Sequence, residues 1–192
     1  MKIKERKTAE TTIKLGLERN EGELNPTIKT GVGFLDHMLT LFAFHSELAL
    51  FVEADGDTWV DDHHTVEDIG IMLGESIRDL YQALPSYERY GFFYLPMDET
   101  LARVVLDLSG RPAISFNAQF SKEKVGTFDT ELVEELFNAV AMNARMTLHI
   151  DLLKAGNTHH EIEGVFKAFA RALKIALKEK SGGVPSSKGL IQ

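Results

Sequence analysis

Two pairs of adjacent histidines are each followed by a glutamate at the same spacing. Residues 63–67 read HHTVE and residues 159–163 read HHEIE, so both fit the pattern HHxxE, with the second copy 96 positions after the first. On a helix the first histidine and the glutamate share a face, whereas the second histidine is rotated by about 100°. Adjacent histidines therefore tend to bind different ions. The doubled motif predicts a two-metal site where the two segments meet, within one chain or between chains.

The ligand types limit which metals such a site could hold. The chain contains no cysteine, which excludes disulfides, thiolate catalysis, iron–sulfur clusters and cysteine-ligated zinc. Imidazole and carboxylate ligands suit manganese, iron, zinc or nickel, and the sequence alone does not select one of them. The patterns HExxH and HxxEH are absent, so a zinc peptidase is not expected.

Two further histidines are weaker candidates when they are taken singly. His37 follows Asp36 in an expected helix, and His149 lies in an expected strand. They are not equivalent in the 96-residue repeat. A lone histidine in such a position is more often a hydrogen-bonded core residue than a ligand, so the residues by themselves favour a structural role for both.

The periodicity of the surrounding sequence predicts the elements that position these motifs. In the first half it predicts strands at 12–18 and 27–30, a helix from 34, a strand at 48–53 and a helix at 64–84. In the second half it predicts strands at 102–108 and 113–120, a helix from 130, a strand at 146–151 and a helix over 162–177.

The order of these elements is the same in both halves of the chain. We therefore predict an α+β fold of duplicated ββαβα half-domains, each a mainly antiparallel sheet with helices packed on one face. Residues 1–90 form the first half with its HHxxE motif. Residues 91–192 form the second half with its HHxxE motif and a C-terminal tail. Together the halves are expected to make one functional domain.

Composition excludes several classes of protein. The 192 residues are 44% hydrophobic and 26% charged, as in an ordinary globular domain. The net charge of -8 disfavours binding to nucleic acid or to anionic membranes. No apolar run approaches the length of about 18 residues that spans a membrane, and the first residues lack the apolar stretch of a signal peptide. We therefore expect a cytoplasmic protein.

Several longer motifs accompany the histidines in order along nearly the whole chain. They are Thr8–Thr11 (TAET), Gly33–Leu39 (GFLDHML), Asp61–Asp68 (DDHHTVED), Pro96–Glu99 (PMDE), Asp107–Pro112 (DLSGRP), Gly156–Glu163 (GNTHHEIE) with Phe166–Ala168 (FKA), and Pro185–Gly189 (PSSKG). Together they resemble imidazoleglycerol-phosphate dehydratase, an enzyme family of histidine biosynthesis. The tail departs from the family at Gly182–Val184, because glycine stands where arginine commonly precedes Val-Pro-Ser, so any contact that this arginine makes in the family is not expected here.

The resemblance implies a reaction and a site. The reaction is the dehydration of D-erythro-imidazole glycerol phosphate to imidazole acetol phosphate, with two Mn²⁺ ions in each active site. It implies a homo-oligomer of 24 subunits with active sites shared between them. The implied metal ligands are His37, His63, His64, Glu67, His149, His159, His160 and Glu163.

The resemblance and the residues together suggest the groups that handle the substrate. Glu10 is the candidate for an acid or base, although an exposed strand carboxylate is nearly as good an interpretation, and the ligands Glu67 and Glu163 complete the catalytic carboxylates. Because the chain is acidic overall, a phosphate ester requires a local positive cluster. The candidates for phosphate binding are Arg89, Arg111, Lys167, Ser186 and Lys188, with Glu10 also placed at the substrate.

The tail and the class of reaction leave alternatives open. Ser181 to Gln192 are predicted to form a segment that closes on the phosphate, because a flexible Ser-Gly-Gly linker precedes the polar residues Ser186, Ser187 and Lys188. An ordinary mobile tail also fits this sequence. A dinuclear metal hydrolase acting on phosphate esters would use the same ligand types. A non-catalytic protein in which metal ions join the subunits would also use them.

Overall fold

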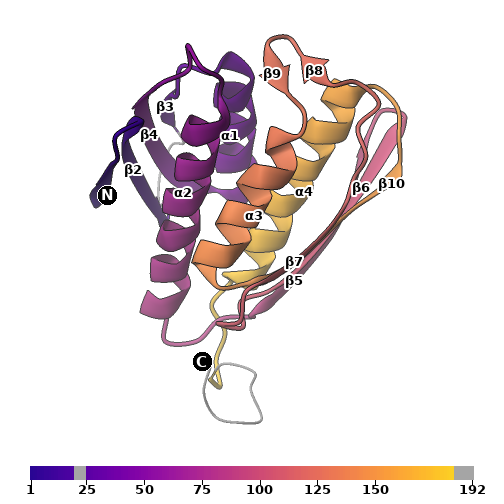
Figure 1. Cartoon of the computed structure of the whole chain (residues 1–192). Coiled ribbons are helices and arrows are strands. Elements are labelled where there is room, and N and C mark those ends of the chain that lie inside the picture. Colours follow the sequence, from indigo (N-terminus) through magenta and orange to yellow (C-terminus); the bar gives the residue numbers. More distant parts are fainter. Residues whose placement is uncertain (20–24, 184–192) are drawn as a thin grey trace.

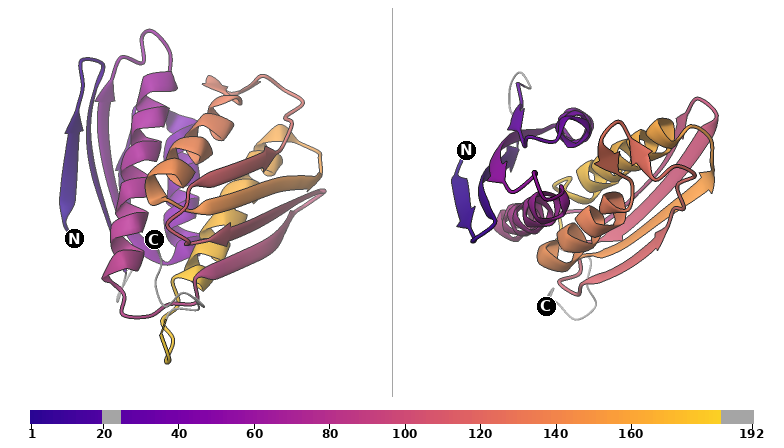
Figure 2. Two further views of the ribbon diagram at one scale, coloured as in Figure 1. Left: turned by 60° about the horizontal axis from the view of Figure 1, so that its bottom comes forward. Right: turned by 45° about the horizontal axis from the view of Figure 1, so that its top comes forward.

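In the part of the chain that the structure describes, two four-stranded sheets enclose four helices, with one sheet on each outer side (Figure 1, Figure 2). The computed structural model describes residues 1–19 and 25–183. Within this described part, no helix has the length and apolar character needed to cross a membrane.

The first half supplies one sheet and two helices. Its elements are β1 (Ile3–Lys7), β2 (Thr11–Arg19), β3 (Thr27–Lys29), α1 (Gly33–Ser46), β4 (Leu48–Gly56) and α2 (His63–Ala83). The strands lie in the order β1-β2-β4-β3. All neighbouring strands are antiparallel except β3 and β4, which are parallel.

The second half repeats this arrangement. Its elements are β5 (Tyr90–Met97), β6 (Thr100–Asp107), β7 (Ala113–Asn117), β8 (Lys124–Val125), β9 (Phe128–Asp129), α3 (Leu132–Ala144), β10 (Thr147–Lys154) and α4 (Thr158–Ala176). The sheet order β5-β6-β10-β7 matches the first sheet strand for strand, including one parallel pair, β7 and β10. Strands β8 and β9 form a separate hairpin.

The predicted duplicated α+β fold is confirmed, but each four-stranded sheet has one more strand than predicted, and the β8–β9 hairpin was not predicted. The additional strands, β1 and β5, are edge strands of their sheets. β1 reads IKERK, so its charged residues hide the alternation that marks a half-buried strand. The expected boundary between residues 90 and 91 falls at the beginning of β5.

The helices are paired in parallel, which gathers their N-termini at one end of the molecule. α1 lies beside α4, where Phe42 stacks on Phe169 with ring centroids 5.8 Å apart. α2 lies beside α3. Phe34 at the start of α1 contacts Phe128, just before α3, at 5.3 Å between ring centroids. This end therefore carries the partial positive charges of the helix N-termini.

Glycine permits the close contact between α2 and α3. A Cβ atom added at Gly74 would lie 2.6 Å from the Val140 carbonyl oxygen and 2.9 Å from the Ala144 nitrogen. Gly33, at the start of α1, has no such neighbour within 4 Å.

We predict that Gly74→Ala lowers the free energy of unfolding by about 1–3 kcal/mol, because the helices must separate to admit the methyl group. Gly33→Ala is the matched control and should be neutral or should stabilise by about 0.4–1 kcal/mol through the unfolded chain. Thermal unfolding followed by circular dichroism measures both. Equal unfolding midpoints for the two variants would contradict this account of the helix contact.

Candidate active site

Three metal-ligating side chains converge between α1 and α4. The Nε2 atom of His159 lies 3.3 Å from Oε2 of Glu163, as their spacing of four residues on one helix predicts. His37 of α1 brings its Nε2 atom within 3.5 Å of the same oxygen. Ligand atoms of the three residues lie within 4.8 Å of one another, which is close enough to share one ion.

Glu163 is the most buried member of this group, with a side chain that is 9% exposed. Burial raises its pKa, but the hydrogen bond and charge of Lys167, together with the neighbouring histidines, outweigh that effect and hold the pKa below its usual value. Glu163 is therefore ionised at neutral pH and suited to bind a cation. Lys167 is engaged by this carboxylate and also lies 3.9 Å from the sulfur of Met97.

His160 points away from this group, as expected for the second histidine of the motif. Its Nδ1 atom lies 3.1 Å from Oε2 of Glu99 and 3.9 Å from Oδ2 of Asp98. Both carboxylates belong to the turn between β5 and β6, and with His160 they form the second group of potential metal ligands. Neither acid was predicted from the sequence to be a site residue. An acidic pair in a hairpin turn has no periodic signal.

The first HHxxE motif has a comparable environment around its second histidine. Nδ1 of His64 lies 3.0 Å from Oδ2 of Asp57, and Nε2 lies 3.8 Å from Oε1 of Glu10. Asp57 was not predicted from the sequence to be a site residue. Glu10 stands in the turn between β1 and β2 and not within a strand. That turn is attached to α2 by Asp68, which accepts a hydrogen bond of 2.5 Å from the Thr11 hydroxyl.

The remaining proposed ligands lie apart from these groups. Among residues 1–19 and 25–183, no cluster of potential ligands includes His63, Glu67 or His149. His149 is exposed on β10, where it is paired in register with Val105. The expectation that His37 and His149 are core histidines is wrong, because both side chains reach the surface.

The cations proposed for phosphate binding are also separated. Arg89 is buried and donates two hydrogen bonds, of 2.7 and 3.0 Å, to Asp107. Bonding to Asp107 raises the pKa of Arg89. The main-chain nitrogen of Arg89 donates to the carbonyl of Ala176, at the end of α4 that lies opposite His159.

The other residues proposed for phosphate binding come from different parts of the chain. Arg111 is exposed in the loop before β7. Ser186, Lys188 and the proposed closing segment from residue 184 onward lie outside the described residues.

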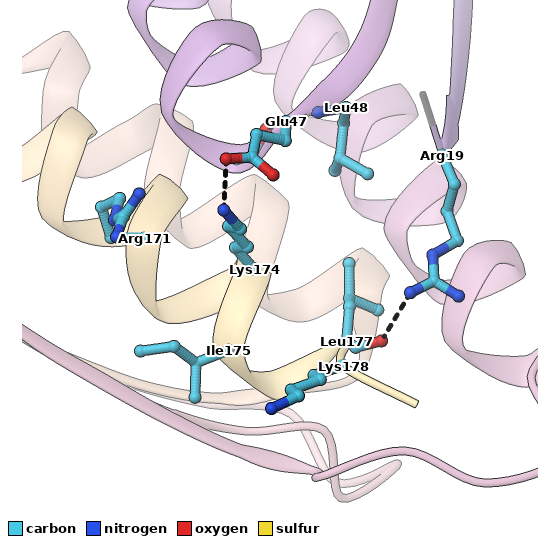
Figure 3. A pocket seen from close by; sticks show the side chains of 9 residues that line it. Arg19, Glu47, Leu48, Arg171, Lys174, Ile175, Leu177 and Lys178 are labelled. Carbon is cyan, nitrogen blue, oxygen red and sulfur yellow. Dashed lines mark hydrogen bonds and ion pairs between the residues drawn. The ribbon is translucent and has the colours of Figure 1, made fainter. Parts of the chain in front are cut away.

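A cavity of about 290 Å³ lies at the same far end of α4, away from the histidines (Figure 3). Its cationic side chains largely have partners in the chain. Lys174 pairs with Glu47, and Arg19 pairs with Glu179 and reaches the carbonyl of Leu177. This cavity contains no histidine and is not part of the candidate active site.

Comparison with known proteins identifies the family. A model of the family described as imidazoleglycerol-phosphate dehydratase matches residues 30–173. The dehydratase of Staphylococcus carnosus is 63% identical over 190 residues, which cover 98% of each chain. The crystal structure of the Staphylococcus aureus N315 dehydratase is 55% identical, with a TM-score of 0.83, over 94% of this chain and 100% of the other.

The same fold is found in a more distant relative. The crystal structure of IGPD from Pyrococcus furiosus in complex with (S)-C348 is 37% identical, with a TM-score of 0.84, and the match covers 97% of this chain and 99% of the other. Sequence and structure thus agree over almost the entire length. The chain belongs to the imidazoleglycerol-phosphate dehydratase family.

Proposed function

We propose that the chain is a manganese-dependent hydro-lyase with two ions in each active site. Membership of the family makes its reaction the removal of water from D-erythro-imidazole glycerol phosphate to give imidazole acetol phosphate, in histidine biosynthesis. The observation that carries the metal dependence is the convergence of His37, His159 and Glu163 from two helices. A biosynthetic role of this kind fits the cytoplasmic location expected from the sequence.

The donor atoms fit a divalent cation of the manganese type. They are imidazole nitrogens and carboxylate oxygens, and Glu163 is held in its ionised form. When bound, the ions would supply Lewis acidity at the imidazole of the substrate, which lets that ring accept electrons as the C–H bond breaks. The proposed ligands are His37, His63, His64, Glu67, His149, His159, His160 and Glu163.

Glu10 is proposed to hold or move a proton of the substrate. Its carboxylate is 53% exposed and lies beside His64, so a bound substrate could reach it. The hydrogen bond between Thr11 and Asp68 fixes the turn that carries Glu10 against α2. We propose that the phosphate is bound by a group of positive and hydroxyl side chains, which the acidic chain needs in order to hold an anion. They are Arg89, Arg111, Lys167, Ser186 and Lys188.

The positions of these residues support active sites that are shared between subunits. Most proposed ligands lie at the helix N-termini, whereas His149 lies on the outer face of the second sheet. Exposed Phe92 and Val105 occupy the same row of this face as His149, and Tyr90 and Tyr94 flank Phe92. An exposed apolar face of this kind is typical of a protein interface. We therefore propose a homo-oligomer, of 24 subunits as the family resemblance implies, in which one chain completes the site of another.

Neither alternative function has a specific observation in its favour. The hydrolase and the structural metal protein would both use the same ligands, but the likeness to a dehydratase structure covers 94% of the chain, and the family model matches residues 30–173.

We predict that removal of metal abolishes dehydration. The purified chain should form imidazole acetol phosphate with Mn²⁺, should lose this activity after treatment with a chelator, and should regain it when Mn²⁺ is restored. Elemental analysis of the active protein should give two ions per chain. Full activity after verified loss of metal would overturn the metal-dependent mechanism, and one ion per chain would overturn the two-metal site.

Neutralising either motif glutamate should reduce both metal retention and turnover. We expect Glu67→Gln and Glu163→Gln each to lower activity by more than about 100-fold, beyond the 10–100-fold typical of losing an outer partner of a metal site. Glu75→Gln, two turns after Glu67 on α2, is the matched control and should retain both properties. Normal metal content and turnover in Glu163→Gln would exclude Glu163 as a ligand.

Metal binding and assembly should be linked if the site is shared. Because the ion would bind the assembled form more tightly, chelation should shift the protein toward smaller species in a concentration-dependent way. Light scattering coupled to gel filtration measures the mass with and without metal. An unchanged mass at every protein concentration, after complete metal removal, would indicate that metal does not join the subunits.

A further inference from the structure

In both halves of the chain, the second histidine of HHxxE faces a carboxylate from outside the motif. Nδ1 of His64 lies 3.0 and 3.2 Å from the two carboxylate oxygens of Asp57. Nδ1 of His160 lies 3.1 Å from Oε2 of Glu99. The same ring nitrogen is therefore engaged in each case, and Nε2 is directed elsewhere.

The local structure holds both carboxylates in place. The main-chain nitrogen of Asp57 donates to the Glu10 carbonyl at 3.2 Å, and the Asp57 side chain is 15% exposed. Oε1 of Glu99 accepts a 2.6 Å hydrogen bond from the nitrogen of Asn157, the residue that caps the N-terminus of α4. Hydrogen bonds from Asn157, from its own main chain and from His160 lower the pKa of Glu99 to about 2.

These two carboxylates come from different elements of the duplicated fold. Asp57 belongs to the segment 57–62 that joins β4 to α2. The corresponding segment of the second half, 155–157, is shorter and offers no acid. Glu99 reaches His160 instead from the β5–β6 hairpin turn. Simple inheritance through duplication would have kept the same element, so the recurrence of the contact indicates a requirement of the histidine itself.

The chemistry of imidazole explains that requirement. An ionised carboxylate can only accept a hydrogen bond, so the facing Nδ1 carries the proton and Nε2 keeps a free lone pair. We propose that Asp57 and Glu99 are positioning residues that hold His64 and His160 in the tautomer and orientation needed to bind metal through Nε2. This rests on the metal site proposed above. Carboxylate partners of this kind also increase the basicity of the ligand nitrogen.

The test measures Mn²⁺ affinity of the full-length protein, from the electron paramagnetic resonance signal of free Mn²⁺. Asp57→Ala and Glu99→Ala should each weaken binding by about 10–100-fold. Asp55→Ala and Glu53→Ala are the controls, because each removes an exposed carboxylate of β4 that belongs to neither group of potential ligands, and they should change affinity by less than about twofold. Unfolding midpoints by circular dichroism verify that each variant remains folded.

The amide variants distinguish a residue that positions the histidine from one that binds the metal ion itself. Asp57→Asn and Glu99→Gln keep an oxygen that can accept from Nδ1, so they should recover part of the affinity lost in the alanine variants. Glu99→Gln as weak as Glu99→Ala would assign Glu99 as a direct ligand and overturn the proposal. Affinity unchanged in both alanine variants would also overturn it.

Glu163→Gln, measured in parallel, distinguishes this inference from the proposed metal site. If Glu163→Gln loses affinity while Asp57→Ala and Glu99→Ala keep it, only the positioning role fails. If Glu163→Gln also binds Mn²⁺ normally, the proposed metal site itself is wrong.

Discussion

The parallel contact between α1 and α4 is the constraint on which the candidate active site depends. Phe42 stacks on Phe169 in the middle of this contact, and Phe137 packs against Phe169 from α3. The register that these rings impose places His37 beside Glu163 at one end of the pair. An antiparallel arrangement about the same two rings would place His37 near the C-terminal end of α4, roughly 16–22 Å along the helix from the second HHxxE motif.

Near the N-terminus of α4, the protein holds an ionised carboxylate whose burial would be unfavourable without a partner. Glu163 is nearly buried, and a buried carboxylate is tolerated only when it is paired. Lys167 supplies that pairing one helical turn away, which keeps Glu163 ionised. The cation proposed for the phosphate thus also prepares a proposed ligand for its ion. Stability and function are linked through one ion pair in this position.

Duplication produced two halves with the same topology but with unequal surroundings for their histidines. In the second half, His159 meets His37 and Glu163 within one chain. In the first half, the described structure brings neither His63 nor Glu67 into such a group. We propose that the apolar outer face around His149 completes the site of a neighbouring chain. The unequal surroundings of the two motifs therefore support the proposal of sites shared between subunits.

The sequence by itself determined the repeat and the helices, and it placed His159 and Glu163 on the same face of one helix. Periodicity and i, i+4 spacing are local properties, so they can be read without the fold. Family motifs identified the reaction. Only the tertiary structure decided that His37 reaches Glu163 and that Arg89 is occupied by Asp107 at the opposite end of α4. It also decided that Asp57 and Glu99 face the second histidines. These contacts depend on strand register and helix pairing between distant segments, and no local pattern encodes them.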